Sequence, residues 1–160
     1  MKLFLLRHAK TKQFSGSGAD FDRKLKEKGE KQLVLMNAHL RKYFPDVEAQ
    51  ILLSTAKRTQ QTFKRLSQNL ENCSCTLDAD LYLADLSIHL HKIAQVKSKQ
   101  DILIIGHNYG ISETATYFLD TPITLPTCGL VVLDFEIDTW DEAFRGNATL
   151  YHQFYPQVLD

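Results

Sequence analysis

Three short apolar runs, each ending in polar or basic residues, constrain the fold more than any other feature of the chain. Residues 2–6, 51–53 and 101–106 are almost uninterrupted apolar segments, and the last of them reads Asp-Ile-Leu-Ile-Ile-Gly. Runs of this length without polar alternation are typical of strands that are buried on both faces of a parallel sheet. A helical pattern follows each run along the chain, and this alternation predicts an α/β fold with a mostly parallel sheet.

The rest of the chain supplies the other elements of this architecture. Helices are expected at about 26–43, 56–70, 86–96 and 109–119, a short third strand near 76–77, and two C-terminal strands at 129–137 and 149–154. Pro45 and Pro122 follow the first and last of these helices, where proline ends helical structure. We therefore expect residues 1–160 to form a single domain, a three-layer α/β/α sandwich in which a C-terminal strand can run antiparallel to the others.

Composition and charge argue against several classes of function. The chain has 19 Lys plus Arg and 19 Asp plus Glu, and a net charge of zero does not suggest binding to nucleic acid or to a membrane surface. No stretch is long and apolar enough to span a bilayer, and the first apolar run is too short for a signal peptide, so a cytoplasmic location is expected. Three cysteines without a secretion signal argue against a disulfide framework, and the Cys73-x-Cys75 spacing does not match a zinc site.

Basic side chains and histidines stand at the points where the three central strands end. Arg7 and His8 follow the first strand, residues 54–58 follow the second, and His107 follows the third. Ligands of open α/β sheets bind beyond the carboxyl ends of the strands, so we expect these side chains to converge. Guanidinium forks match phosphate oxygens, and a neutral imidazole can attack phosphorus and hold the phosphoryl group covalently. The pattern therefore predicts a phosphate site.

Three blocks of the sequence resemble, in order, the motifs of the histidine phosphatase superfamily, which has the phosphoglycerate mutase-like fold. Residues 6–9, Leu-Arg-His-Ala, resemble its Arg-His-Gly signature, with alanine in place of glycine. Residues 54–62 resemble the block in which Ser and Arg precede a Gln-Thr pair, and residues 105–108 resemble the block in which a strand ends in a small residue and a histidine. The segment Asp22-Arg23-Lys24-Leu25 and the short chain resemble the SixA branch, the small phosphohistidine phosphatases.

The resemblance implies a role for each matching residue. His8 would be the nucleophile and would pass through a phosphohistidine. Arg7, Arg58 and His107 would bind the phosphoryl oxygens, and Arg23 would add a contact at the rim of the site.

The proton donor is the point at which the sequence departs from many members of the family. Those members use a carboxylic acid after the middle strand, and the nearest candidate here is Asp80. The SixA branch is described as lacking a strong acid, which suits an imidazole leaving group because it needs less protonation than an alkoxide. Asp20 and Asp22 are expected to be loop or cap residues.

These observations predict a phosphatase that needs no metal and no cofactor, because arginines supply the positive charge. Its substrate would be phosphohistidine in a protein or a related phosphomonoester. Two alternatives stay open. One is a phosphatase for a sugar phosphate or a nucleotide, with Asp80 as the acid. The other is a phosphate-binding module that has lost turnover.

Overall fold

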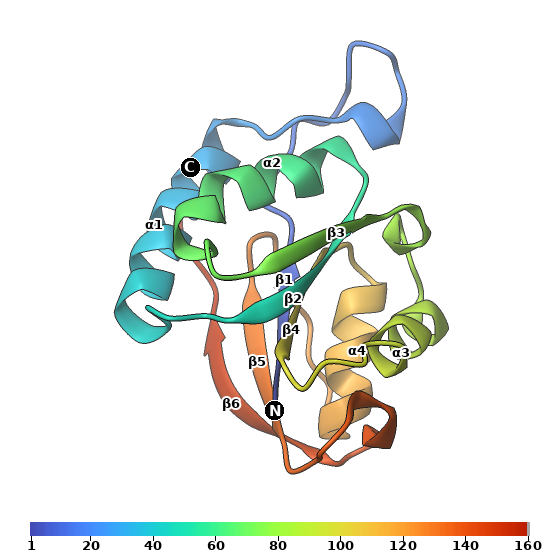
Figure 1. Ribbon diagram of the computed structural model, residues 1–160. Coiled ribbons are helices and arrows are strands. Elements are labelled where there is room, and N and C mark those ends of the chain that lie inside the picture. The colour runs from blue at the N-terminus through green and yellow to red at the C-terminus, as the bar shows by residue number, and fades with distance from the viewer. Residues whose placement is uncertain (160) are drawn as a thin grey trace.

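Residues 1–159, which the computed structural model describes, form a six-stranded sheet (Figure 1). The strands are β1 (Lys2–Arg7), β2 (Ala49–Ser54), β3 (Ser74–Asp78), β4 (Asp101–Gly106), β5 (Leu130–Phe135) and β6 (Ala148–Phe154). They lie in the order β3-β2-β4-β1-β5-β6. The first four in that order run parallel, whereas β5 is antiparallel to β1 and β6 is antiparallel to β5. The mostly parallel sheet and the antiparallel C-terminal strand that the sequence predicts are confirmed.

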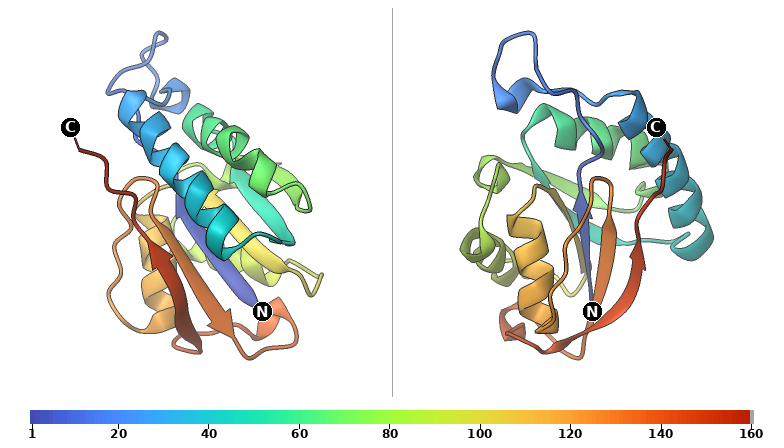
Figure 2. Two further views of the ribbon diagram at one scale, coloured as in Figure 1. Left: turned by 90° about the vertical axis from the view of Figure 1, so that its left-hand side faces the viewer. Right: turned by 180° about the vertical axis from the view of Figure 1, so that it is seen from behind.

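Helices cover both faces of this sheet and complete a three-layer sandwich, as Figure 1 and Figure 2 show. They are α1 (Glu27–Tyr43), α2 (Lys57–Leu66), α3 (Leu86–Ala94) and α4 (Gly110–Leu119). Neighbouring residues of β1 point into the two opposite cores. Leu6 packs in the core that holds Leu33 of α1, and Leu5 packs in the core that holds Phe118 of α4. The predicted α/β/α layering is therefore confirmed.

The central strands explain why the sequence has apolar runs without alternation. β1 lies between β4 and β5, and Leu5 of β1 pairs with Ile104 of β4. Both side chains are completely buried, as are Leu3 and Ile102 at the next pair on the same face. A strand covered by helices on both faces has no position for a polar side chain, because burying one without a partner is costly.

Short 3-10 helices account for several differences from the expected elements. The second helix ends at Leu66 rather than at residue 70, because a 3-10 turn, η2 (Ser67–Asn69), follows it. Two further 3-10 helices, η1 (Asp20–Asp22) and η3 (Ala79–Leu81), lie in segments for which the sequence predicts no helix or strand. The third strand, β3, spans five residues where two were expected.

Parallel pairing brings the carboxyl ends of β1, β2 and β4 to one edge of the sheet. At the last pair of β1 and β4, Arg7 lies opposite Gly106. Beyond it, the N–H of His8 donates to the carbonyl of Gly106 at 3.1 Å, so the two strand ends are tied together. Residues that are about a hundred positions apart in the sequence therefore meet at this edge.

Candidate active site

The backbone and the imidazole of His8 are both held in place just beyond β1. The carbonyl of His8 accepts from the N–H of Cys128 at 2.9 Å, and the residue is only 6% exposed. Its Nδ1 lies 2.8 Å from the carbonyl oxygen of Ala9, which can only accept, so Nδ1 carries the proton. Nε2 is then an acceptor, and Nε of Arg58 donates to it at 3.2 Å. This tautomer leaves the lone pair of Nε2 directed at a guanidinium group.

Arg58 lies in the first turn of α2 and is 2% exposed. Its Nη1 donates to the carbonyl oxygen of Asp20 at 2.9 Å, and its Nη2 donates to Oδ2 of the same residue at 3.0 Å. One buried guanidinium therefore links the imidazole of His8 to η1 and places a positive charge at the carboxyl end of β1.

Arg7 contributes a second positive charge from the end of β1. Its Nη1 donates to the carbonyl oxygen of Leu125 at 3.0 Å. Its Nε is buried and has no hydrogen-bond partner within residues 1–159. Burial lowers the pKa of Arg7, but a guanidinium group keeps its charge in proteins. The charges of Arg58, Arg7 and Arg23 all act on His8.

His107 follows β4 and faces His8 across the site, with 5.4 Å between the ring centroids. Its Nε2 lies 2.7 Å from Oγ of Ser54, the last residue of β2. The ring of Tyr82 contacts it edge-on, with centroids 5.5 Å apart, and His107 is 2% exposed. The structure thus brings Arg7, His8, Arg58 and His107 together at the carboxyl ends of the central strands. These four residues form a positively charged cup.

Both histidines of the cup are neutral at physiological pH. Burial, followed by the charges of Arg58 and Arg7, lowers the pKa of His8 to about 3. Burial, followed by the charge of Arg58, lowers the pKa of His107 to about 3 as well. A neutral imidazole has the free lone pair that nucleophilic attack requires.

An acidic residue that the sequence reasoning did not assign to the site lies against the cup. The carboxylate of Asp20 accepts from Nη2 of Arg58 and, at 2.9 Å, from Nε of Arg23. The hydroxyl of Tyr82 donates to it at 2.5 Å. The hydrogen bond from Tyr82, followed by the arginines, lowers the pKa of Asp20 to about 2. Arg23 therefore lies at the rim and reaches the cup through Asp20.

The structure does not bring Asp80 to the cup. This residue lies on η3, where its carboxylate accepts from Nζ of Lys92 at 2.9 Å and its side chain is 69% exposed. Lys92 also pairs with Asp78 at 2.8 Å. The hydrogen bond and charge of Lys92 lower the pKa of Asp80, so this carboxyl is ionised at the protein surface.

The Gln-Thr pair of the second sequence block joins α2 to the segment that carries His8. Oγ1 of Thr62 donates to the carbonyl of Arg58 at 2.8 Å and accepts from the N–H of Ala9 at 3.1 Å. Oε1 of Gln61 accepts from the N–H of Leu25 at 2.9 Å. These side chains hold the cup together from outside it, a role that their place in a motif does not reveal.

Neither a metal cluster nor a membrane span occurs in the part of the chain that the structure describes. Residues 1–159 contain no group of three or more His, Cys, Asp or Glu side chains that could hold a metal ion. None of the helices there combines the length and the apolar character needed to cross a membrane. Cys73, Cys75 and Cys128 are free thiols.

Comparisons with known proteins agree with this architecture. The family model of the histidine phosphatase superfamily, branch 1, matches residues 3–88, which is more than half of the chain. An uncharacterized chloroplastic protein of Arabidopsis thaliana is 28% identical over 159 residues, covering 89% of this chain and 70% of its own length.

Two solved structures of SixA proteins resemble the chain over nearly its whole length. The one from Nakamurella multipartitia has a TM-score of 0.82 at 22% identity and covers 98% of this chain and 96% of its own. The one from Agrobacterium tumefaciens has a TM-score of 0.79 at 27% identity and covers 97% of each chain. With the family model matched over its N-terminal half and the fold shared with SixA proteins, the chain belongs to the histidine phosphatase superfamily, branch 1, and is a phosphoric monoester hydrolase.

Proposed function

We propose that this phosphatase hydrolyses phosphohistidine in a protein partner through a covalent phosphohistidine on Nε2 of His8. The observation that carries the proposal is the pair of hydrogen bonds that His8 makes, from which its protonation state follows. Nδ1 is bonded to the Ala9 carbonyl, Nε2 is free of a proton, and Nε2 faces the guanidinium of Arg58 in a buried, positively charged site. A lone pair held next to fixed cations suits attack on an anionic phosphoryl group.

In the first step, the Nε2 lone pair of His8 attacks phosphorus, and the bond between phosphorus and the substrate nitrogen breaks. The guanidinium groups of Arg7 and Arg58 bind the phosphoryl oxygens. His107 donates a hydrogen bond to a third oxygen from Nδ1, which has no hydrogen-bond partner within residues 1–159, while its Nε2 accepts from the hydroxyl of Ser54. These groups stabilise the charge that spreads over the oxygens in the transition state. The electron pair of the broken bond returns to the leaving imidazole.

In the second step, water attacks the phosphohistidine on the face opposite Nε2. The bond between phosphorus and Nε2 breaks, its electron pair returns to His8, and inorganic phosphate leaves. The proton from the attacking water goes to phosphate or to solvent. Because burial and the neighbouring arginines favour the neutral imidazole, His8 is restored without a further proton transfer.

The carboxyl groups near the site favour an imidazole leaving group over an alkoxide. Asp20 has a pKa of about 2, and Asp80 is paired with Lys92, so both are ionised at neutral pH and neither can act as a general acid. A phosphorylated imidazole whose second nitrogen is protonated leaves as a neutral ring and needs no acid. An alkoxide leaving group does need one, and loss of general acid catalysis costs roughly 10²–10⁴-fold in rate.

The relatives support the same substrate class. The two SixA structures come from proteins assigned as phosphohistidine phosphatases. A phosphorylated protein is therefore the partner that we propose, acting without nucleic acid or a membrane.

A comparison of leaving groups tests the proposal. We expect kcat/KM for free phosphohistidine to exceed that for glycerol phosphate by at least about 100-fold, because no acid protonates the alkoxide. His8→Ala should lose turnover of every substrate. His91→Ala, which removes an exposed histidine of α3 outside the cup, should retain it.

Each alternative gives a different result in the same comparison. Equal rates with glycerol phosphate and phosphohistidine would favour a small-molecule phosphatase with a working acid. Binding of phosphate without turnover of any substrate by the wild type would favour a binding module.

A further inference from the structure

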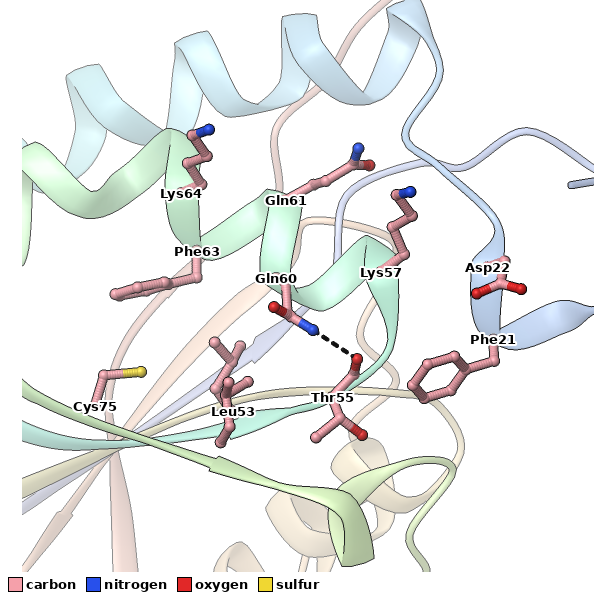
Figure 3. Close-up of a pocket in the computed structure, with 11 residues that line it drawn as sticks. Phe21, Asp22, Leu53, Thr55, Lys57, Gln60, Gln61, Phe63, Lys64 and Cys75 are labelled. Atoms are coloured by element: carbon pink, nitrogen blue, oxygen red, sulfur yellow. Dashed lines mark hydrogen bonds between the residues drawn. The ribbon is translucent and has the colours of Figure 1, made fainter. Parts of the chain in front are cut away.

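A groove of about 670 Å³ lies between α2 and the edge strand β3 (Figure 3). This volume is within the roughly 300–1,000 Å³ of typical ligand sites. The groove is lined by Phe21, Asp22, Leu53, Thr55, Lys57, Gln60, Gln61, Phe63, Lys64, Cys75 and Leu77. None of these residues belongs to the cup, so the groove is a separate surface.

The floor of the groove is apolar because α2 leaves the outermost strand uncovered. Leu53 of β2 pairs with Leu77 of β3, and parallel partners point to the same face of a sheet. Leu53 is buried at 2% exposure, whereas Leu77 is 54% exposed although it lies on the same face. Cys75 lies two residues before Leu77 and is also exposed. Phe63 of α2 closes the floor from the helix side (Figure 3).

The charged lining, or wall, of the groove consists of two lysines on α2 and one carboxylate, that of Asp22 on η1, so it is positive by one charge. Lys57 and Lys64 lie two turns apart on α2, and both are exposed. Neither ammonium group has an ion-pair partner within the described chain. Seven residues of helix separate their Cα atoms by about 10.5 Å. An extended segment covers that distance in roughly three to four residues, at about 3.3 Å per residue.

One end of the groove is lined by residues that adjoin the cup, or a direct partner of the cup, in the sequence. Phe21 and Thr55 line that end. Phe21 directly follows Asp20, which binds Arg58, and Thr55 directly follows Ser54, which contacts His107. Lys57 directly precedes Arg58. A macromolecular substrate whose phosphoryl group reaches His8 would therefore have part of its chain next to this groove.

We infer that the groove docks a segment of the phosphoprotein substrate that carries apolar side chains between acidic ones. The inference rests on the proposed function and names the substrate surface that this site selects. The apolar side chains would lie on Leu53, Phe63 and Leu77, and the acidic ones opposite Lys57 and Lys64. Burial of the exposed Leu77 supplies attraction, and the charges on the wall select acidic over basic segments.

Two synthetic peptides and free phosphohistidine test this inference. Each peptide carries one phosphohistidine and the same apolar residues. The acidic peptide has two acidic residues three to four positions apart. The lysine peptide has lysines at the same two positions. The enzyme variants are Lys64→Glu, which reverses one charge of the wall, and Leu77→Glu, which places a charge on the exposed floor. The control is Lys99→Glu, because Lys99 is an exposed lysine in the loop before β4, at the opposite end of the sheet.

We expect the wild type to prefer the acidic peptide over the lysine peptide by about tenfold in kcat/KM, mainly through KM. Lys64→Glu and Leu77→Glu should each remove most of that preference and leave kcat/KM for free phosphohistidine within about twofold of the wild type. Lys99→Glu should behave as the wild type with all three substrates.

The possible failures are distinguishable. If the wild type hydrolyses all three substrates without preferring the acidic peptide, or if Lys64→Glu keeps the preference, the docking inference is wrong and the proposed function stands. If the wild type hydrolyses none of the three, the proposed function is wrong and the inference falls with it. A preference for the lysine peptide would also overturn the inference.

Discussion

Two contacts of His8 set its protonation before any substrate arrives. The Ala9 carbonyl fixes the proton on Nδ1, and Arg58 donates to Nε2. Burial and the adjacent arginine charges then oppose a second proton on the ring, so the pKa is about 3. In the proposed mechanism, His8 therefore needs no separate general base to act as the nucleophile at neutral pH.

Substitution of Asp20 tests whether its carboxylate competes with phosphate for the cup. Its carboxylate occupies the Nη2 group of Arg58, which a phosphoryl oxygen would also use. We expect Asp20→Asn to lower the inhibition constant of inorganic phosphate by about fivefold, about 1 kcal/mol, because a competing negative charge is removed. Product inhibition measured in steady-state assays gives this constant.

Asp22→Asn is the matched control for that substitution. The carboxylate of Asp22 accepts from Oγ of Ser17 at 2.6 Å. Its substitution should leave the inhibition constant unchanged. If Asp20→Asn instead weakens phosphate inhibition, the role of Asp20 is to orient Arg58 and not to compete with phosphate.

At the scale of single residues, the sequence predicted those groups that directly follow buried strands. Arg7, His8 and His107 lie where the ends of β1 and β4 place them. Asp20 and Tyr82 were missed because each reaches the cup from a segment outside those strand ends. Asp20 and Arg23 form an ion pair in the structure, and their spacing of three residues was the only local sequence pattern that pointed to this segment.

Among the secondary-structure elements, the start of α1 supports the chain that leaves the cup. Gly29 lies against Lys10, and a Cβ at position 29 would be 2.2 Å from the Lys10 carbonyl oxygen. That oxygen also accepts from the N–H of Lys26 at 3.0 Å. The first turn of the helix is therefore fixed to the segment just after His8, and a side chain cannot be inserted between them without movement of the backbone.

Gly29→Ala tests this contact because two effects have opposite signs. Helix propensity alone favours alanine by about 1 kcal/mol. Forced insertion of a methyl group into a packed contact costs about 1–3 kcal/mol. We expect the steric cost to dominate, so the free energy of unfolding in urea should fall by up to about 2 kcal/mol, and kcat/KM should fall as well.

Gly16→Ala provides the comparison for that measurement. A Cβ at Gly16 would have no neighbour within 4 Å, so the free energy of unfolding should change by no more than about 0.5 kcal/mol. Stabilisation by Gly29→Ala would mean that Lys10 yields easily and that the contact does not constrain the cup.

Elements with an uninterrupted apolar pattern were predicted well, and short polar elements were not. The order of strands and helices followed from pattern alone because each central strand is buried on both faces. The 3-10 helices η1 and η3 have no apolar period, and they form only where the chain turns around the site. The end of α2 at Leu66 was likewise not marked by a proline or glycine.

In the molecule as a whole, buried neutral histidines couple the fold to pH. Burial lowers the pKa of His8 and His107 to about 3 and that of His89 to about 4. The unfolded chain takes up these protons near pH 6.5. The stabilisation is therefore complete above about pH 6.5 and is lost progressively as the pH falls from there toward the folded-state values.

We expect the free energy of unfolding to decrease from pH 7.5 to pH 5, by up to about 1.4 kcal/mol per pH unit for each of the three imidazoles. Urea unfolding at several pH values measures this slope. His89→Leu should reduce this slope by about a third, because it removes one of the three imidazoles. The substitution breaks no side-chain hydrogen bond, because neither ring nitrogen of His89 has a partner within residues 1–159. Constant or rising stability on acidification would contradict the neutral state of these histidines.

The proposed mechanism depends on three parallel strands, β1, β2 and β4, whose carboxyl ends place His8, Arg58 and His107 at one edge of the sheet, and it assigns His8 as the phosphate acceptor. Rapid acid-free quenching of the enzyme with radiolabelled phosphohistidine peptide tests that claim most directly. We predict label on the protein that is stable in base, lost in acid, and located on His8 by peptide mapping, with none on His8→Ala. Turnover by the wild type without any trapped label, or with label on a residue other than His8, would contradict the account.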